Sequence, residues 1–209
     1  MNKKLLIPGL IGVAIVGAVI YFTRRPSLEA QAATLMDCLM DQDAACVLRY
    51  IDSGDRAAYQ LDKPKITLLL SRFHQTLRPE QGGVEVAKQP GATMVVCQAP
   101  FVSNINSKQL TVGFLLSETG EGVKAPQFVT QALLALSAAS APAKGTGGIS
   151  KLEAWEYYAR EKGPEWQRDG FPGILRDPEE GMLQWSEWAK HCRDRIQKAK
   201  ARTPGVANS

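Results

Sequence analysis

The feature that most constrains this chain is an apolar run of 18 residues, Leu5 to Phe22, that contains no charged side chain. As a helix rising about 1.5 Å per residue, the run would be roughly 27 Å long, which matches the hydrocarbon core of a bilayer. Basic residues border it on both sides: Lys3, Lys4, Arg24 and Arg25. The sequence therefore predicts an N-terminal transmembrane helix, with residues 1–27 as a membrane anchor.

A cleaved signal peptide is the alternative, because the triplet Ala30-Gln31-Ala32 resembles a cleavage site. The apolar run is longer than the 7–15 residues typical of such signals, and charged residues separate it from the triplet. We therefore favour a retained anchor. The very short segment before it resembles bacterial signal anchors, so we expect the following domain outside the cytoplasm, on the periplasmic side.

The charge of the rest of the chain is balanced. The whole chain has 25 basic and 21 acidic residues, and four of the basic residues lie within residues 1–27. The remaining chain is therefore neutral. Binding of nucleic acid requires a basic surface that neutralises phosphates, so we expect no nucleic-acid partner.

The four cysteines show no C-x-x-C spacing, so they do not indicate a zinc, iron–sulfur or redox site. On one continuous helix, Cys38 and Cys46 would lie about 12 Å apart, too far for a disulfide. A turn at 41–43 would create two packed helices and bring them together. Buried free thiols and a disulfide between Cys38 and Cys46 both remain open.

Hydrophobic periodicity predicts an α+β domain over residues 28–139. Apolar residues recur at helical spacing first, with Ser27, Asp43 and Asp62 as N-caps. The period then changes to two, which predicts antiparallel strands. The predicted helices cover about 28–40, 44–51, 63–77 and 126–139, and the predicted strands about 84–86, 93–102, 110–116 and 123–124.

A small-residue segment, 140–149, is typical of a linker. The segment after it, 150–202, contains all four tryptophans and predicts a helical appendage. Gly163-Pro164 should end its first helix, and Asp177-Pro178 should begin its last, about 178–201. Residues 203–209 read as a frayed tail.

Two patterns resemble the NTF2-like superfamily, the cystatin-like α+β cone. One is the amphipathic first helix that runs into 40–45 (MDQDAA), and the other is the strand 110–116 followed by the glycine turn 118–124 (ETGEGVK). The resemblance implies helices packed on a curved antiparallel sheet around a conical pocket. Some members use this pocket for catalysis, and many use it only for binding or assembly. The turn lacks the family's tryptophan, and a predicted helix stands where a final strand is usual.

No catalytic, cofactor or metal motif stands out. The two histidines, His74 and His191, fit a helix boundary and a basic face better than a catalytic base. The glycines of 145–148 have no following Lys-Ser/Thr pair, so they do not form a phosphate-binding loop. Asp41 and Asp43 are explained as turn and cap residues. We therefore predict no catalytic residue, no cofactor and no metal ligand.

The candidate contact surface for a partner is the tryptophan-rich segment with its basic end, because Trp and Arg anchor many interfaces. Two other interpretations of this segment remain: a helical cap on the sheet, or a helix lying on anionic lipid.

The favoured function of the protein is a membrane-anchored, non-enzymatic binding or assembly module, an accessory subunit of a membrane complex. The alternative is a ligand binder or enzyme with a cone pocket. The candidate docking residues are Trp155, Trp166, Trp185, Trp188, Arg193, Arg195 and Lys198.

The mature protein should keep its apolar N-terminal run, because charged residues separate that run from the cleavage-like triplet. Mass spectrometry of the native protein checks this expectation. A native N-terminus at Ala33 would show that the run is removed as a signal peptide.

Overall fold

A computed structural model of the chain describes residues 26–80, 82–88, 92–142, 149–171, 176–177, 181–182 and 184–202. The predicted anchor, residues 1–25 with the run Leu5–Phe22 and with Arg24 and Arg25, lies outside these residues, as do most of the linker and the tail 203–209. In the part of the chain that is described, no helix combines the length and hydropathy needed to cross a membrane.

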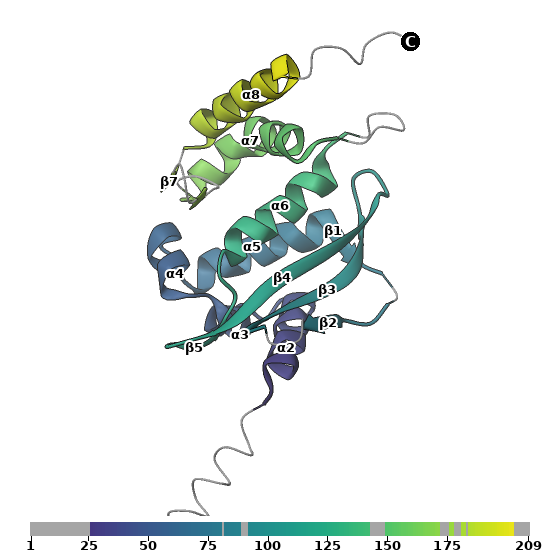
Figure 1. Cartoon of the computed structure of the whole chain (residues 1–209), viewed down its shortest axis with the longest axis vertical. Helices are drawn as coiled ribbons and strands as arrows, with labels where there is room; N and C mark the ends of the chain where they lie inside the picture. The colour runs from purple at the N-terminus through teal and green to yellow at the C-terminus, as the bar shows by residue number, and fades with distance from the viewer. Residues whose placement is uncertain are drawn as a thin grey trace, which may run out of the picture.

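The described chain is an α+β fold with a curled antiparallel sheet and helices (Figure 1). The helices are α2 (Leu28–Met40), α3 (Ala44–Tyr50), α4 (Ser53–Tyr59), α5 (Lys63–Thr76), α6 (Phe128–Ser140), α7 (Lys151–Arg168) and α8 (Trp185–Arg202). The strands are β1 (Leu77–Pro79), β2 (Glu85–Lys88), β3 (Met94–Ser103), β4 (Gln109–Thr119), β5 (Gly122–Lys124), β6 (Arg176–Asp177) and β7 (Gly181–Met182).

The N-terminal helices begin where the sequence places acceptor side chains. Ser27 Oγ accepts from the backbone of Ala30, Asp43 Oδ1 caps α3, and Asp62 Oδ1 accepts from Lys65 N at 2.9 Å. These bonds satisfy amide groups that a helix leaves without partners. The predicted caps are confirmed. Helix α4, capped by Asp52, was not predicted.

The turn between α2 and α3 reverses the chain at Gln42, which adopts a left-handed conformation with φ 57°. The reversal brings the Cα atoms of Cys38 and Cys46 to 5.8 Å, and the structure joins the two cysteines as a disulfide. That separation lies within the usual range for such bonds. The turn that the sequence suggested between the two helices is therefore present.

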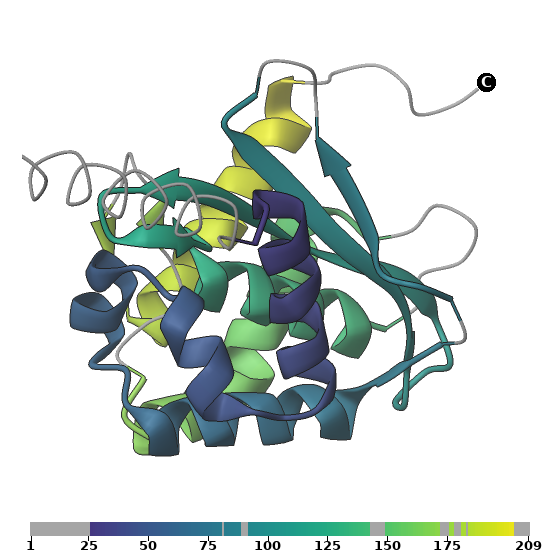
Figure 2. The ribbon, with the colours of Figure 1, turned by 90° about the horizontal axis from the view of Figure 1, so that it is seen from below.

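Strand β3 is the centre of the main sheet. One edge of β3 pairs with β4, in register from Met94↔Ser117 to Val102↔Gln109. The other edge of β3 pairs with both β1 and β2. Strand β5 pairs antiparallel with the last residues of β4, from Ser117↔Lys124 to Thr119↔Gly122. Figure 2 shows the curled sheet with α2 in front of it. Leu77 belongs to β1 and not to the preceding helix as predicted, because Leu77 pairs with Ser103.

Aromatic side chains fill the helix-covered face of the sheet. Phe101 and Phe114 are fully buried, as are Phe73 of α5 and Phe128 of α6. Phe101 meets Phe73 edge to face at 5.4 Å between ring centroids, and Phe114 stacks on Phe128 at 4.8 Å. Alternate residues of β3 and β4 point to this core, as the period of two predicts.

Helix α6 lies along the part of β4 that no strand covers. The backbone amide of Leu115 donates to Gln131 Oε1 of α6 at 3.1 Å, which occupies a donor of an otherwise open edge. At the other end of α6, Asn106 donates to the carbonyls of Ala139 and Ala141. Helix α6 includes Ser140, one residue past the predicted end of this helix at 139.

Helices α7 and α8 form an antiparallel pair outside α6 (Figure 1). Helix α7 does not end at Gly163-Pro164 as predicted but continues to Arg168. Helix α8 begins at Trp185, later than the predicted start near 178, because residues 176–177 and 181–182 pair as a small hairpin. The absence of a Cβ at Gly163 is what allows Trp185 of α8 to approach α7 closely.

Gly163→Ala tests this close approach. An added Cβ would lie 2.7 Å from Trp185 Cβ, an atom fixed to the backbone of α8. We expect a loss of about 1–3 kcal/mol, seen as a lower melting temperature. Gly120→Ala is the control, because nothing lies within 4 Å of a Cβ there. Equal melting temperatures for both variants would contradict the packing of α8 on α7.

Candidate functional site

The helical hairpin, defined as α7 and α8 together, contains the residues that the sequence marked as a docking surface. Helix α7 opens with a complete capping box, in which Ser150 Oγ accepts from Glu153 N while the Glu153 carboxylate accepts from Ser150 N. Such a reciprocal cap fixes the first turn of the helix. The hairpin therefore starts at a defined position directly after the linker.

All four tryptophans are buried, with exposed fractions of 1–4%. Trp155 and Trp188 meet edge to face across the two helices, with ring centroids 6.4 Å apart. Trp166 contacts Phe171 edge to face at 4.9 Å. The assignment of the tryptophans to a docking surface is wrong in this respect, because a residue that anchors a partner must be accessible. Their aromatic rings form the core of the hairpin instead.

Buried indole groups need acceptors, and two of them find acceptors within the hairpin region. Trp166 Nε1 donates to Tyr158 Oη at 2.7 Å, and Trp185 Nε1 donates to the carbonyl oxygen of Phe171 at 2.9 Å. Burial raises the pKa of Tyr158, so its hydroxyl stays protonated. Trp188 Nε1 is buried and has no hydrogen-bond partner among the described residues.

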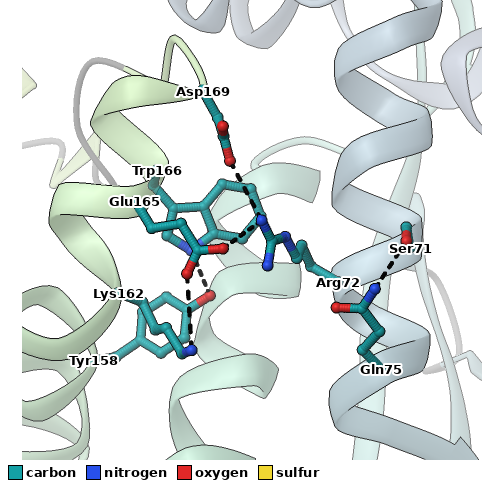
Figure 3. A network of polar contacts seen from close by, with 8 residues as sticks. All are labelled: Ser71, Arg72, Gln75, Tyr158, Lys162, Glu165, Trp166 and Asp169. Carbon is teal, nitrogen blue, oxygen red and sulfur yellow. Dashed lines mark hydrogen bonds and ion pairs between the residues drawn. The ribbon is translucent and has the colours of Figure 1, made fainter.

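A polar network joins the hairpin to α5 (Figure 3). Arg72 of α5 forms an ion pair with Glu165 of α7 and lies 3.7 Å from Asp169 Oδ2. Lys162 also pairs with Glu165, at 3.8 Å. These side chains are 27–46% exposed, so the network contributes at most about 1 kcal/mol per pair and mainly fixes orientation.

A second contact joins the end of α7 to α5. Lys65 Nζ donates to the carbonyl oxygens of Tyr59 and Gly170, at 3.1 and 2.9 Å, and lies over the ring of Phe171. Gly170 has φ 83°, a conformation that glycine adopts without strain. Lys65 and Gly170 lie 105 residues apart, and Arg72 is similarly distant from Glu165. No local pattern identifies these pairs, so sequence analysis missed them.

The three predicted basic docking residues do not share one surface. At about 100° per helical residue, Arg195 points about 200° away from Arg193. Arg193 faces α7, where its Nη1 lies 3.2 Å from Glu156 Oε1. Lys198 is exposed and lies nearer to Arg195 around the helix. The basic residues of α8 therefore form two separate stripes.

A groove runs between α7 and α8 on the side where Arg193 lies. We call it the hairpin groove and define it by two adjoining hollows of about 250 and 350 Å³ that share Arg160. The first hollow is lined by Ala159, Arg160, Pro164, Gln167, Trp185, Ser186, Ala189 and Arg193. The second is lined by Pro142, Ile149, Glu153, Glu156, Tyr157, Arg160, Ile196 and Lys200.

Histidine and cysteine are among the residue types most often used as catalytic bases and nucleophiles, so their surroundings bear on the predicted absence of catalytic residues. His74 lies with its Nε2 2.8 Å from the carbonyl oxygen of Leu39, which joins α5 to α2. Burial raises the pKa of Cys97 to about 11, so its thiol is protonated at neutral pH. Cys192 is also buried. Over the described ranges, no group of three or more His, Cys, Asp or Glu is placed to hold a metal ion.

Comparisons with known proteins add no relative: no family model, no curated protein and no solved structure matches this chain. The resemblance to the NTF2-like superfamily therefore stays a prediction from sequence.

Replacement of Tyr158 by Phe tests the hydrogen bond inside the hairpin. The change leaves Trp166 Nε1 buried without its acceptor, which should cost about 1–3 kcal/mol of unfolding free energy. Tyr157→Phe is the matched control, because the neighbouring residue is half-buried and its ring contact with Arg160 is kept. Chemical denaturation measures both variants, and an equal effect of the two would contradict the assigned bond.

Proposed function

We propose that this protein is a membrane-anchored, non-enzymatic binding module, an accessory or scaffolding subunit of a membrane protein complex. The observation that carries the proposal is the position of the hairpin groove. Helix α8 lies at the end of the molecule opposite the start of α2 (Figure 1). Since the predicted anchor directly precedes α2, the groove would be presented away from the bilayer, where another subunit can reach it.

The packed interior supports binding at the surface over chemistry in a cone pocket. An NTF2-like pocket would open on the helix-covered face of the sheet, and Phe101, Phe114 and Phe128 occupy that face with no exposed surface. Active sites commonly combine a hollow with convergent polar groups. The hollows of the hairpin groove instead lie at the surface along α7 and α8, and the second also borders Pro142 and Ile149.

The disulfide between Cys38 and Cys46 supports placement of the domain outside the cytoplasm. Disulfides persist in oxidising compartments such as the periplasm and are rare in the cytosol. The bridge closes a short loop of the α2–α3 pair, with a sequence separation of 8 residues. The loop-entropy relation assigns such a bridge about 2–3 kcal/mol.

Extraction in a mild detergent followed by native mass measurement tests the proposal. We expect the full chain to stay in washed membranes and to be released as part of a multi-subunit assembly. The control is the same chain without residues 1–25, which should be recovered in the soluble fraction. A full-length protein that leaves the membrane as a lone monomer would contradict the proposal.

Thiol labelling tests the side of the membrane on which the domain lies. Lys108→Cys introduces a thiol at an exposed position before β4, and the natural cysteines outside the Cys38–Cys46 pair, Cys97 and Cys192, are buried. We expect a membrane-impermeant maleimide to label the variant in intact cells with a permeable outer membrane, and not to label the unmodified protein. Labelling only after rupture of the inner membrane would place the domain in the cytoplasm.

A further inference from the structure

The hairpin groove is long enough to hold one face of a third helix. Its lining on α7 extends from Glu153 to Gln167, a distance of about 21 Å along the helix axis. Small side chains, Ala159 and Ala189, lie at the seam between the two helices, and Ile196 continues the apolar floor. Helices pack by placing the ridge of one into the groove between others, so a helix of about 14 residues matches this length.

The two edges of the groove differ in charge. The α8 edge carries Arg193 and Lys200, with exposed Lys190 beside them. The α7 edge carries Glu153 and Glu156 as well as Arg160. The α8 edge is therefore uniformly basic, whereas acidic and basic groups alternate along the α7 edge.

The acidic groups of the α7 edge are already engaged within the hairpin. Glu156 Oε1 lies 3.2 Å from Arg193 Nη1 and 3.7 Å from Arg160 Nη1, and the Glu153 carboxylate accepts from the backbone and hydroxyl of Ser150. The same pairs engage Arg193 and Arg160, so the charge left to face a partner is that of Lys200, with Lys190 beside it, both exposed on α8. An approaching helix gains most where its own acidic residues face α8.

We propose that the hairpin groove binds an amphipathic helix of another protein subunit, with an apolar stripe against the seam and acidic residues along the edge that faces α8. This inference rests on the proposed function and names the chemistry of the partner. Recognition of this kind uses apolar anchors at i, i+3, i+4 and i+7. The acidic edge then fixes the direction and register in which the helix lies.

Other occupants fit less well. The apolar run Leu5–Phe22 of a second copy is bordered on both sides by basic residues, so the basic edge would repel it. A lipid surface offers acidic headgroups, but α8 lies opposite the start of α2 (Figure 1), and a concave groove is not covered by a planar bilayer. A protein helix meets both the shape and the charge.

Binding of model peptides tests the chemistry directly. The probes are labelled helical peptides of about 18 residues with leucines at i, i+3, i+4 and i+7 and either glutamates or lysines along one edge. Fluorescence anisotropy with the full chain in detergent should show at least tenfold tighter binding of the glutamate peptide, with a smaller difference at high salt. Equal affinities, or tight binding to anionic phosphatidylglycerol vesicles without preference for the peptide, would overturn the proposal.

Two variants locate the binding to the groove. Lys200→Glu should weaken binding of the glutamate peptide about five- to tenfold, because it places a like charge at the groove edge. The matched control is Lys198→Glu, which makes the same change of charge on the same helix but outside the groove lining. Ser186→Trp, at an exposed lining position, should fill the first hollow and abolish binding without lowering the melting temperature. Equal effects of the two charge reversals would overturn the assignment.

The same variants separate this inference from the proposed function in the native membrane. If the unmodified chain is extracted within an assembly and Ser186→Trp with Lys200→Glu is extracted alone, the groove holds the partner. If the double variant assembles normally, the groove inference is wrong while the proposed function stands. If the unmodified chain does not assemble, the proposed function itself is wrong.

Discussion

The packing of indole rings between α7 and α8 is the interaction on which the outer part of the molecule depends. Trp185 can lie against α7 only because Gly163 lacks a Cβ, and its Nε1 is satisfied by the carbonyl oxygen of Phe171. The same close approach leaves small residues, Ala159 and Ala189, along the outer seam. Large aromatics are therefore buried inside the pair while small side chains line the groove outside it, so the shape of the surface follows from the packing of the core.

The hairpin is joined firmly to the α+β part, and this connection determines how it can function. Phe171 is fully buried beside Trp166, and Lys65 holds the end of α7 through Gly170. Arg72 adds charged contacts to Glu165 on the same side. Since apolar burial contributes most of the free energy and the ion pairs mainly orient the helices, the groove keeps a fixed position relative to α2. A binding surface held in this way can receive a partner without the entropic cost of ordering a flexible arm.

Local signals in the sequence predicted most elements of the fold. Such signals act over a few residues, so the signal and the element that it predicts lie close together in the sequence. Examples are the caps Ser27, Asp43 and Asp62 and the alternation in β3 and β4.

The end of α7 was predicted incorrectly at Pro164. A proline destabilises a helix through neighbouring residues, which the sequence shows, whereas the free energy gained when α7 continues and packs on α8 comes from residues distant in the sequence. The tryptophans were misread for a related reason: composition identifies residues with large apolar surface, but it does not tell whether a second helix of the same chain or a different protein covers that surface. The contact between Arg72 and Glu165 joins segments more than 90 residues apart, and nothing in either segment marks the pairing.

The basic residues of α8 do not form one continuous surface. The exposed basic residues of this helix divide into a stripe along the groove and a stripe on the opposite side, and Glu187 and Asp194 lie between them around the helix. An extended polyanion would need one continuous basic track along the surface, which this alternation interrupts. A short acidic edge on a helix needs only the stripe beside the groove, and the apolar seam next to it supplies the remaining contact. The division of the basic residues therefore favours a compact acidic partner over a nucleic acid, in agreement with the neutral charge of the chain after its first 27 residues.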